Sequence, residues 1–198
     1  MNLVRTKKML LVLTCCLAIC LAVVLTGCGG SSKSSEPVKS TNGYVSVTEY
    51  NENGLKTFID TKTEMVTFAK PHPSNNDQPS SDKMICFVTV DKSGDIWFID
   101  EPEGITIFTA GQPYTKDMLS ADLTAYQAKY PNILEDLEEV TIGEYTYYAS
   151  HMTVNGEDGI QYVSVVDDKP VAITIVGADL LNDEGVKKCI ESVKWNFS

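Results

Sequence analysis

Residues 140–176 constrain the fold of this chain more than any other stretch. They contain four runs rich in β-branched and aromatic residues, a composition typical of strands. The runs are residues 140–142, 145–154, 160–166 and 170–176. The links between them are two to five residues long and carry Gly, Asn and Asp, which tight hairpin turns prefer. Because strands joined by such short links must run antiparallel, the sequence predicts a four-stranded antiparallel meander.

Six further strands are predicted before the meander, each from a short run of apolar, β-branched or aromatic residues. They are residues 44–50, 55–60, 65–70, 84–90, 96–99 and 105–109. Residues 71–81 are polar and contain Pro, so they are predicted to form a loop that takes no part in a core.

Two amphipathic helices are predicted beside these strands. Residues 114–130 carry apolar side chains at offsets of 4, 3 and 4, which place them on one helix face, and Thr115 can cap that helix. Residues 132–139 are acidic and are predicted to form a connection. The second helix follows the meander and can be capped by Asn182 or Asp183. Together the elements predict an α+β domain, an antiparallel β-sheet covered by two helices.

The order of these elements is similar to that of a known family. Strands precede a long helix, a meander with an Asp167-Asp168-Lys169 hairpin, and a short helix that ends in Glu-Ser-Val-Lys-Trp at residues 191–195. This order resembles the PsbP-like α/β sandwich domains found in many bacterial lipoproteins. The resemblance covers residues 96–197. It implies a binding or assembly module without a shared set of catalytic residues.

The first 28 residues carry an export signal. Three basic residues precede an apolar run over residues 9–25, and residues 25–28 read Leu-Thr-Gly-Cys. These four residues resemble the bacterial lipobox, in which cleavage falls between Gly27 and Cys28 and Cys28 is then lipidated. The alternative is an uncleaved membrane helix. The apolar run is 17 residues long, at the short end of the ~17–25 residues that a membrane span needs.

Cleavage would divide the chain into three parts. Residues 1–27 are a lipoprotein signal peptide. Residues 28–43 are Gly/Ser-rich with little to bury, so they are predicted to be a flexible tether. Residues 44–198 are predicted to fold as a single domain, since 155 residues fall in the usual range of domain sizes.

The charge of the chain argues against nucleic-acid binding. Removal of residues 1–27 takes away three basic residues and leaves 13 Lys and no Arg against 27 acidic residues, a net charge of −14. Nucleic-acid affinity comes mainly from Lys and Arg on phosphates. The same charge argues against direct adhesion to anionic lipid head groups. Contact with the membrane is therefore expected only through acyl chains, such as palmitate, on Cys28.

His151 is the candidate for chemistry among the two His residues. It lies in the predicted strand 145–154 and by alternation shares a face with Tyr145 and Tyr147. These three residues are the candidate ligand contacts. A hydrolase could use His151 as a general base, but the chain has no G-x-S-x-G motif to mark a nucleophile. A histidine that packs among tyrosines and donates one hydrogen bond fits the same pattern.

No metal or cofactor site is predicted. The sequence has no H-x-x-x-H or C-x-x-C spacing. Asp91, Ser93 and Asp95 mimic the start of a calcium loop, but Ile96 stands where that loop needs Gly. Cys86 and Cys189 remain in the predicted domain, either as one disulfide or as two buried thiols.

These observations predict a lipid-anchored protein at the extracytoplasmic face of the cell membrane. Its domain is predicted to be non-catalytic and to bind an unidentified protein or small molecule. The alternatives are a small secreted hydrolase or metal-dependent enzyme on the same anchor, and the solute-binding component of a transporter. Carboxylates that converge with His151 in a pocket would favour an enzyme.

Overall fold

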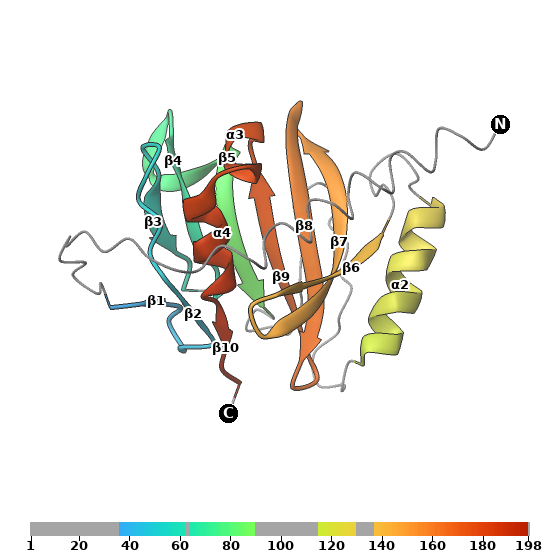
Figure 1. Ribbon diagram of the computed structural model, residues 1–198. Coiled ribbons are helices and arrows are strands. Elements are labelled where there is room, and N and C mark those ends of the chain that lie inside the picture. Colours follow the sequence, from blue (N-terminus) through green and yellow to red (C-terminus); the bar gives the residue numbers. More distant parts are fainter. Residues whose placement is uncertain (1–35, 62–63, 90–114, 130–136, 198) are drawn as a thin grey trace, which may run out of the picture. The chain divides into compact units, whose positions relative to one another are not determined.

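The computed structural model describes residues 36–61, 64–89, 115–129 and 137–197, which form two antiparallel sheets and three helices (Figure 1). The strands are β1 (Val38–Lys39), β2 (Val45–Val47), β3 (Lys56–Ile59), β4 (Val66–His72), β5 (Asn75–Thr89), β6 (Glu138–Ile142), β7 (Tyr145–Val154), β8 (Glu157–Val166), β9 (Lys169–Val176) and β10 (Lys194–Trp195). The helices are α2 (Lys116–Lys129), α3 (Ala178–Leu181) and α4 (Glu184–Glu191). The signal peptide, the predicted strands at 96–99 and 105–109, and the loop at 91–95 lie outside the described residues.

The predicted meander is confirmed. Strands β6, β7, β8 and β9 pair antiparallel in chain order, and β7 has the predicted bounds. β9 then pairs with β5, with Ile173 opposite Phe87. The large sheet therefore has the order β3-β4-β5-β9-β8-β7-β6, so the last strand of the meander lies beside a strand from the first half of the chain.

The predicted fold class is wrong. The structure is mostly β, with 53% in strands and 18% in helices, and it is not a PsbP-like sheet covered by two helices. A second sheet of three strands, in the order β1-β2-β10, joins the two ends of the described chain. Val45 and Val47 of β2 and Trp195 of β10 lie in the same core cluster as Phe68 and Phe87 of the large sheet. Strands of the small sheet and helices therefore cover this face of the large sheet together.

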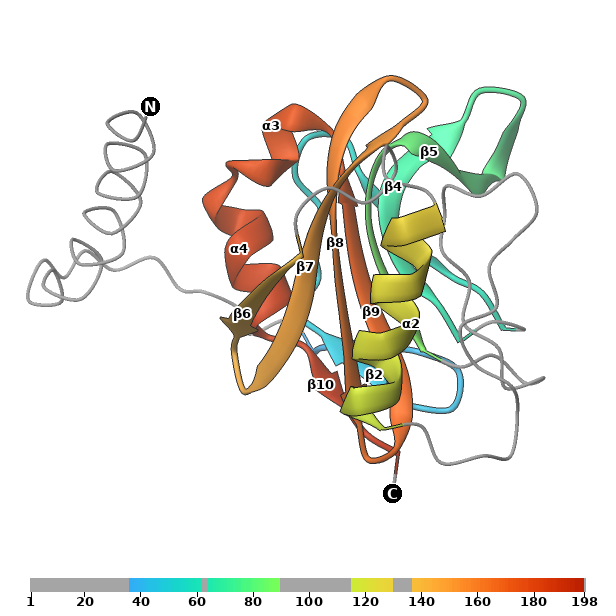
Figure 2. The ribbon, with the colours of Figure 1, turned by 90° about the vertical axis from the view of Figure 1, so that its right-hand side faces the viewer.

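The two faces of the large sheet are covered by different elements. Figure 2 shows α3 and α4 on one side of the sheet and α2 on the other. Leu180 and Val186 belong to the core cluster on the first side. Leu119 and Leu123 of α2 pack against a separate cluster on the second, made by Val88, Val163 and Ala172. The predicted cap of α2 is confirmed, since the amide of Met118 donates to Thr115 Oγ1 over 3.2 Å.

Three local predictions are also corrected. Residues 71–81 are not a loop, because β4 and β5 continue through them as an exposed hairpin. The part of β5 in this hairpin is polar on both sides, so hydropathy does not reveal it as a strand. The pairing of β4 with β5 shifts register at Pro71, which has no amide hydrogen. β1 lies within the expected tether, since Val38 packs on the core. Glu138 and Glu139 belong to β6 rather than to a connection.

A buried hydrogen bond ties the small sheet to the meander. Trp195 Nε1 donates to the hydroxyl oxygen of Tyr147 over 2.9 Å, and these side chains are 4% and 1% exposed. The amide of Trp195 also donates to the hydroxyl of Tyr145 over 3.3 Å. Burial raises the pKa of Tyr147 well above its usual value, so this phenol stays neutral and keeps its hydrogen bond at any ordinary pH.

Replacement of Tyr147 by Phe should therefore destabilise the protein. It leaves the buried Trp195 Nε1–H without its acceptor, which costs about 1–3 kcal/mol in the free energy of unfolding. Urea unfolding followed by fluorescence measures the change. The matched control is Tyr44→Phe, because the Tyr44 hydroxyl has no hydrogen bond within the described segments, and it should stay within about 0.5 kcal/mol of wild type. Equal stability of both variants would contradict the role given to this bond.

Candidate functional site

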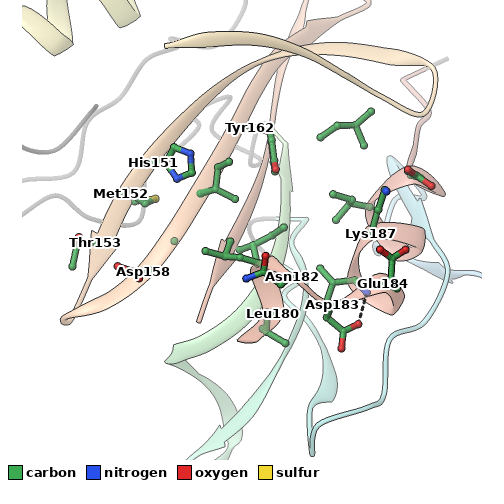
Figure 3. A pocket seen from close by; sticks show the side chains of 18 of the residues that line it. His151, Met152, Thr153, Asp158, Tyr162, Leu180, Asn182, Asp183, Glu184 and Lys187 are labelled. Carbon is green, nitrogen blue, oxygen red and sulfur yellow. Dashed lines mark hydrogen bonds between the residues drawn. The ribbon is translucent and has the colours of Figure 1, made fainter. Parts of the chain in front are cut away.

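A cleft of about 810 Å³ opens between the outer strands of the meander and helices α3 and α4. Its floor is apolar, and its rim is polar and largely acidic. The floor includes Ile142, Ile160, Tyr162, Ile175, Leu180, Val186 and Ile190, and the rim includes Thr153, Asp158, Asn182, Asp183, Glu184, Lys187 and Glu191. Figure 3 places His151 and Tyr162 on the strand side and Glu184 and Lys187 on the helix side.

The helix wall begins at a confirmed cap. Asp183 Oδ1 accepts hydrogen bonds from the amides of Gly185, over 2.7 Å, and Val186, over 3.0 Å. The bond from Val186 is the main cause that lowers the pKa of Asp183, and the bond from Gly185 adds to it. Asn53 bridges this end of α4 to the N-terminal segment, since its amide donates to the hydroxyl of Tyr50 and to Asp183 Oδ2. Burial raises the pKa of Tyr50 to about 12.

The other end of α4 rests against the turn between β6 and β7. Gly143 has a φ of +59°, and a Cβ atom there would stand 2.6 Å from the carbonyl oxygen of Glu191. Only glycine permits both the backbone conformation and this approach. Lys194, which follows α4, forms an ion pair with Glu144 in the same turn. The helix is therefore held at both ends, with Val186 and Ile190 facing the cleft between them.

The floor follows from the register of three strands. His151 of β7 lies opposite Ile160 of β8, which lies opposite Ile175 of β9. The three side chains form one row across the sheet, and all three line the cleft. Tyr162 stands one row along the sheet, half-buried, and burial raises the pKa of its phenol.

The structure separates the three candidate ligand contacts. His151 lines the cleft and is exposed, and its imidazole has no hydrogen-bond partner within the described segments. Tyr145 and Tyr147 share its side of β7 but do not line the cleft. Tyr147 is buried beneath Trp195, and Tyr145 packs against Tyr147 with ring centroids 6.4 Å apart. Cys28 and Gly27 lie outside the described residues.

Most residues of the cleft are not among the three candidate ligand contacts predicted from the sequence. They include Tyr162 of β8 and the charged residues of α4. Glu184, Lys187 and Glu191 stand three and four residues apart, which places charges on one side of a helix whose other side is apolar. That spacing could have shown a charged face, but not that strands lie opposite it.

Other features of the described residues add no chemistry to the cleft. No group of three or more His, Cys, Asp or Glu side chains within them could hold a metal ion. Cys86 and Cys189 are free and buried, and burial raises their thiol pKa values to about 11 and about 12.

Across the described part of the chain, no helix combines the length and apolar character that a membrane span requires.

Comparisons with known proteins assign no family. No protein-family model and no curated protein matches this chain. Among solved structures, a protein of Bacteroides thetaiotaomicron VPI-5482 is similar, with 10% sequence identity and a TM-score of 0.43. The match covers 82% of this chain and 49% of the other, so this chain spans about half the length of that protein. Similarity at this level assigns neither a family nor a function.

Replacement of Gly143 by Ala should displace the end of α4 and destabilise the protein. The new Cβ meets the Glu191 carbonyl and forces a non-glycine residue into the left-handed region, a conformation that alone costs about 1–2 kcal/mol. Gly156→Ala is the matched control, since Gly156 also has positive φ but nothing within 4 Å of its Cβ position. The free energy of unfolding should fall further for Gly143→Ala, and equal losses would contradict the close contact.

The cap of α4 should make stability depend on acid. Because the pKa of Asp183 is lowered in the folded protein, its contribution is complete above the unfolded value of about 3.9. It is lost as the pH falls through the lowered folded value. Asp183→Asn keeps an accepting oxygen that does not titrate. The urea midpoint should therefore drop less between pH 7 and pH 3 in this variant than in wild type, and equal drops would contradict the cap's ionic character.

Proposed function

We propose that this chain is a lipid-anchored extracytoplasmic protein that binds a ligand in the α4 cleft without transforming it. The cleft itself is the observation that carries the proposal. Its volume of about 810 Å³ falls within the ~300–1,000 Å³ typical of ligand sites. An apolar floor with a few polar groups at the rim is also the usual composition of such sites.

His151 takes the role of a ligand contact in this proposal. A general base must lie within hydrogen-bond reach of the nucleophile whose proton it takes, either directly or through one water. No described Ser, Asp or Glu side chain is hydrogen-bonded to the His151 imidazole; Ser150 Oγ donates only to the backbone carbonyl of His151. The imidazole lies in one row with Ile160 and Ile175, so it supplies a polar group beside an aliphatic surface.

The lipid anchor would keep the cleft near the membrane. Val38, the first residue of β1, lies ten positions after Cys28. A fully extended chain of that length spans at most about 33–36 Å. Acyl chains on Cys28 would thus hold Val38, where the domain begins, within that distance of the bilayer surface.

The proposed function is tested on the full chain purified from membranes of its own cells. Mass spectrometry under native conditions should find a non-covalent ligand on the wild type. Ile160→Trp should lose that ligand, because the larger side chain fills the floor of the cleft. Cys28→Ala should leave the membrane fraction and take up no labelled palmitate.

The control for the cleft is the same substitution at Ile59, which is 46% exposed on the edge strand β3 and does not line the cleft. Ile59→Trp should keep the ligand. Retention of the ligand by both tryptophan variants would contradict binding in the cleft. Palmitate on the Cys28→Ala protein would contradict the anchor.

A further inference from the structure

Given the ligand-binding function proposed for the cleft, on which this inference rests, we propose that the ligand is a short basic segment of polypeptide. The segment lies extended between α4 and the floor strands. Its aliphatic side chains contact the floor, and its Lys or Arg side chains reach the carboxylates of the rim.

The charges around the cleft favour a cation. Four carboxylates line it, against one lysine. The carboxylate of Asp183 is engaged by the cap of α4. Within the described segments, Asp158, Glu184 and Glu191 have no ion-pair partner, whereas the ion pairs Lys83–Asp179 and Lys194–Glu144 lie elsewhere.

Lys187 does not cancel this excess of negative charge. It stands three residues after Glu184 and four before Glu191 on the same helix, yet it is not within ion-pair distance of either. The net charge of the lining is therefore negative even with Lys187 counted. A negative rim attracts a positively charged ligand and opposes an anionic one.

The lining is elongated along the strands. It begins at Ile142, which pairs with Tyr145 at the start of β7, and reaches Thr153 near the end of that strand. This is eight residues along β7, or about 27 Å at ~3.4 Å per residue. An extended chain follows such a path better than a compact ligand.

Polar groups recur along the path, which favours a peptide over an alkyl amine. Thr141, His151 and Thr153 line the cleft together with its aliphatic residues. The half-buried hydroxyl of Tyr162 has no hydrogen-bond partner within the described part of the chain. A peptide offers one amide donor and one carbonyl acceptor at nearly every residue. An alkyl chain would cover these groups and leave them unpaired, which is unfavourable.

The test uses the full-length protein in phosphatidylcholine nanodiscs and three fluorescein-labelled, amidated peptides. Their sequences are Lys-Leu-Val-Leu-Lys, Asn-Leu-Val-Leu-Asn and Glu-Leu-Val-Leu-Glu, so the apolar centre is the same and the end residues are basic, neutral or acidic. Fluorescence anisotropy, corrected with empty nanodiscs, measures each dissociation constant. The basic peptide should bind about tenfold more tightly than the neutral one, and the acidic peptide should bind most weakly.

Charge variants locate the effect. Glu184→Gln combined with Glu191→Gln should weaken the affinity for the basic peptide about tenfold, or about threefold for each lost ion pair. The affinity for the neutral peptide should change less than twofold. Because the whole chain carries a net charge of −11, general attraction needs a control. Glu36→Gln combined with Asp77→Asn removes the same charge from exposed positions outside the cleft and should leave both affinities unchanged.

The outcomes separate this inference from the function on which it rests. Equal binding of the three peptides, blocked by Ile160→Trp, would overturn the preference for a basic ligand but support binding in the cleft. If no peptide binds while the wild type retains a co-purified small molecule, the ligand is not a peptide, but the ligand-binding function of the cleft stands. Absence of both would overturn both proposals. An equal loss in the two charge variants would overturn the role of the rim.

Discussion

The pairing of β5 with β9 is the contact on which the rest of the structure depends. It joins residues 84–89 to residues 171–176 in a six-residue antiparallel register, and it places β9 in the centre of the large sheet. All but the first residue of β9 are buried, so this strand contributes to the clusters on both faces. Without this pairing the meander would be a separate sheet with β9 as an open edge.

The position of the cleft follows from what continues beyond β9. Helices α3 and α4 begin directly after that strand and lie over the face shared with the small sheet. The large sheet is wider than these elements, so they cover β7 and β8, which form part of the floor of the cleft, only in part. The cap at Asp183 and the glycine contact at Gly143 fix α4 at its two ends, and the cleft remains along its length.

The chemistry of the cleft combines two features with different physical origins. The strand residues of its apolar floor belong to the sheet face that packs against α3 and α4, so they come from the same alternation that builds the sheet. Its acidic rim comes from α4 with its cap, Asp183, and from Asp158 near the start of β8. A ligand that matches both must carry aliphatic groups and positive charge within a short length.

Local sequence determined the meander, the cap at Thr115, a second cap at Asn182 or Asp183, and the face of β7 that carries His151, because alternation and capping act over a few residues. It could not determine the polar hairpin at 71–81, whose strands are held by backbone bonds and lack an apolar face. Tertiary structure alone decided that β9 pairs with β5, that the chain ends form a second sheet in place of a cover of two helices, and that Tyr147 is core while Tyr162 lines the cleft. Each of these depends on contacts between residues far apart in sequence, whose partners no local pattern identifies.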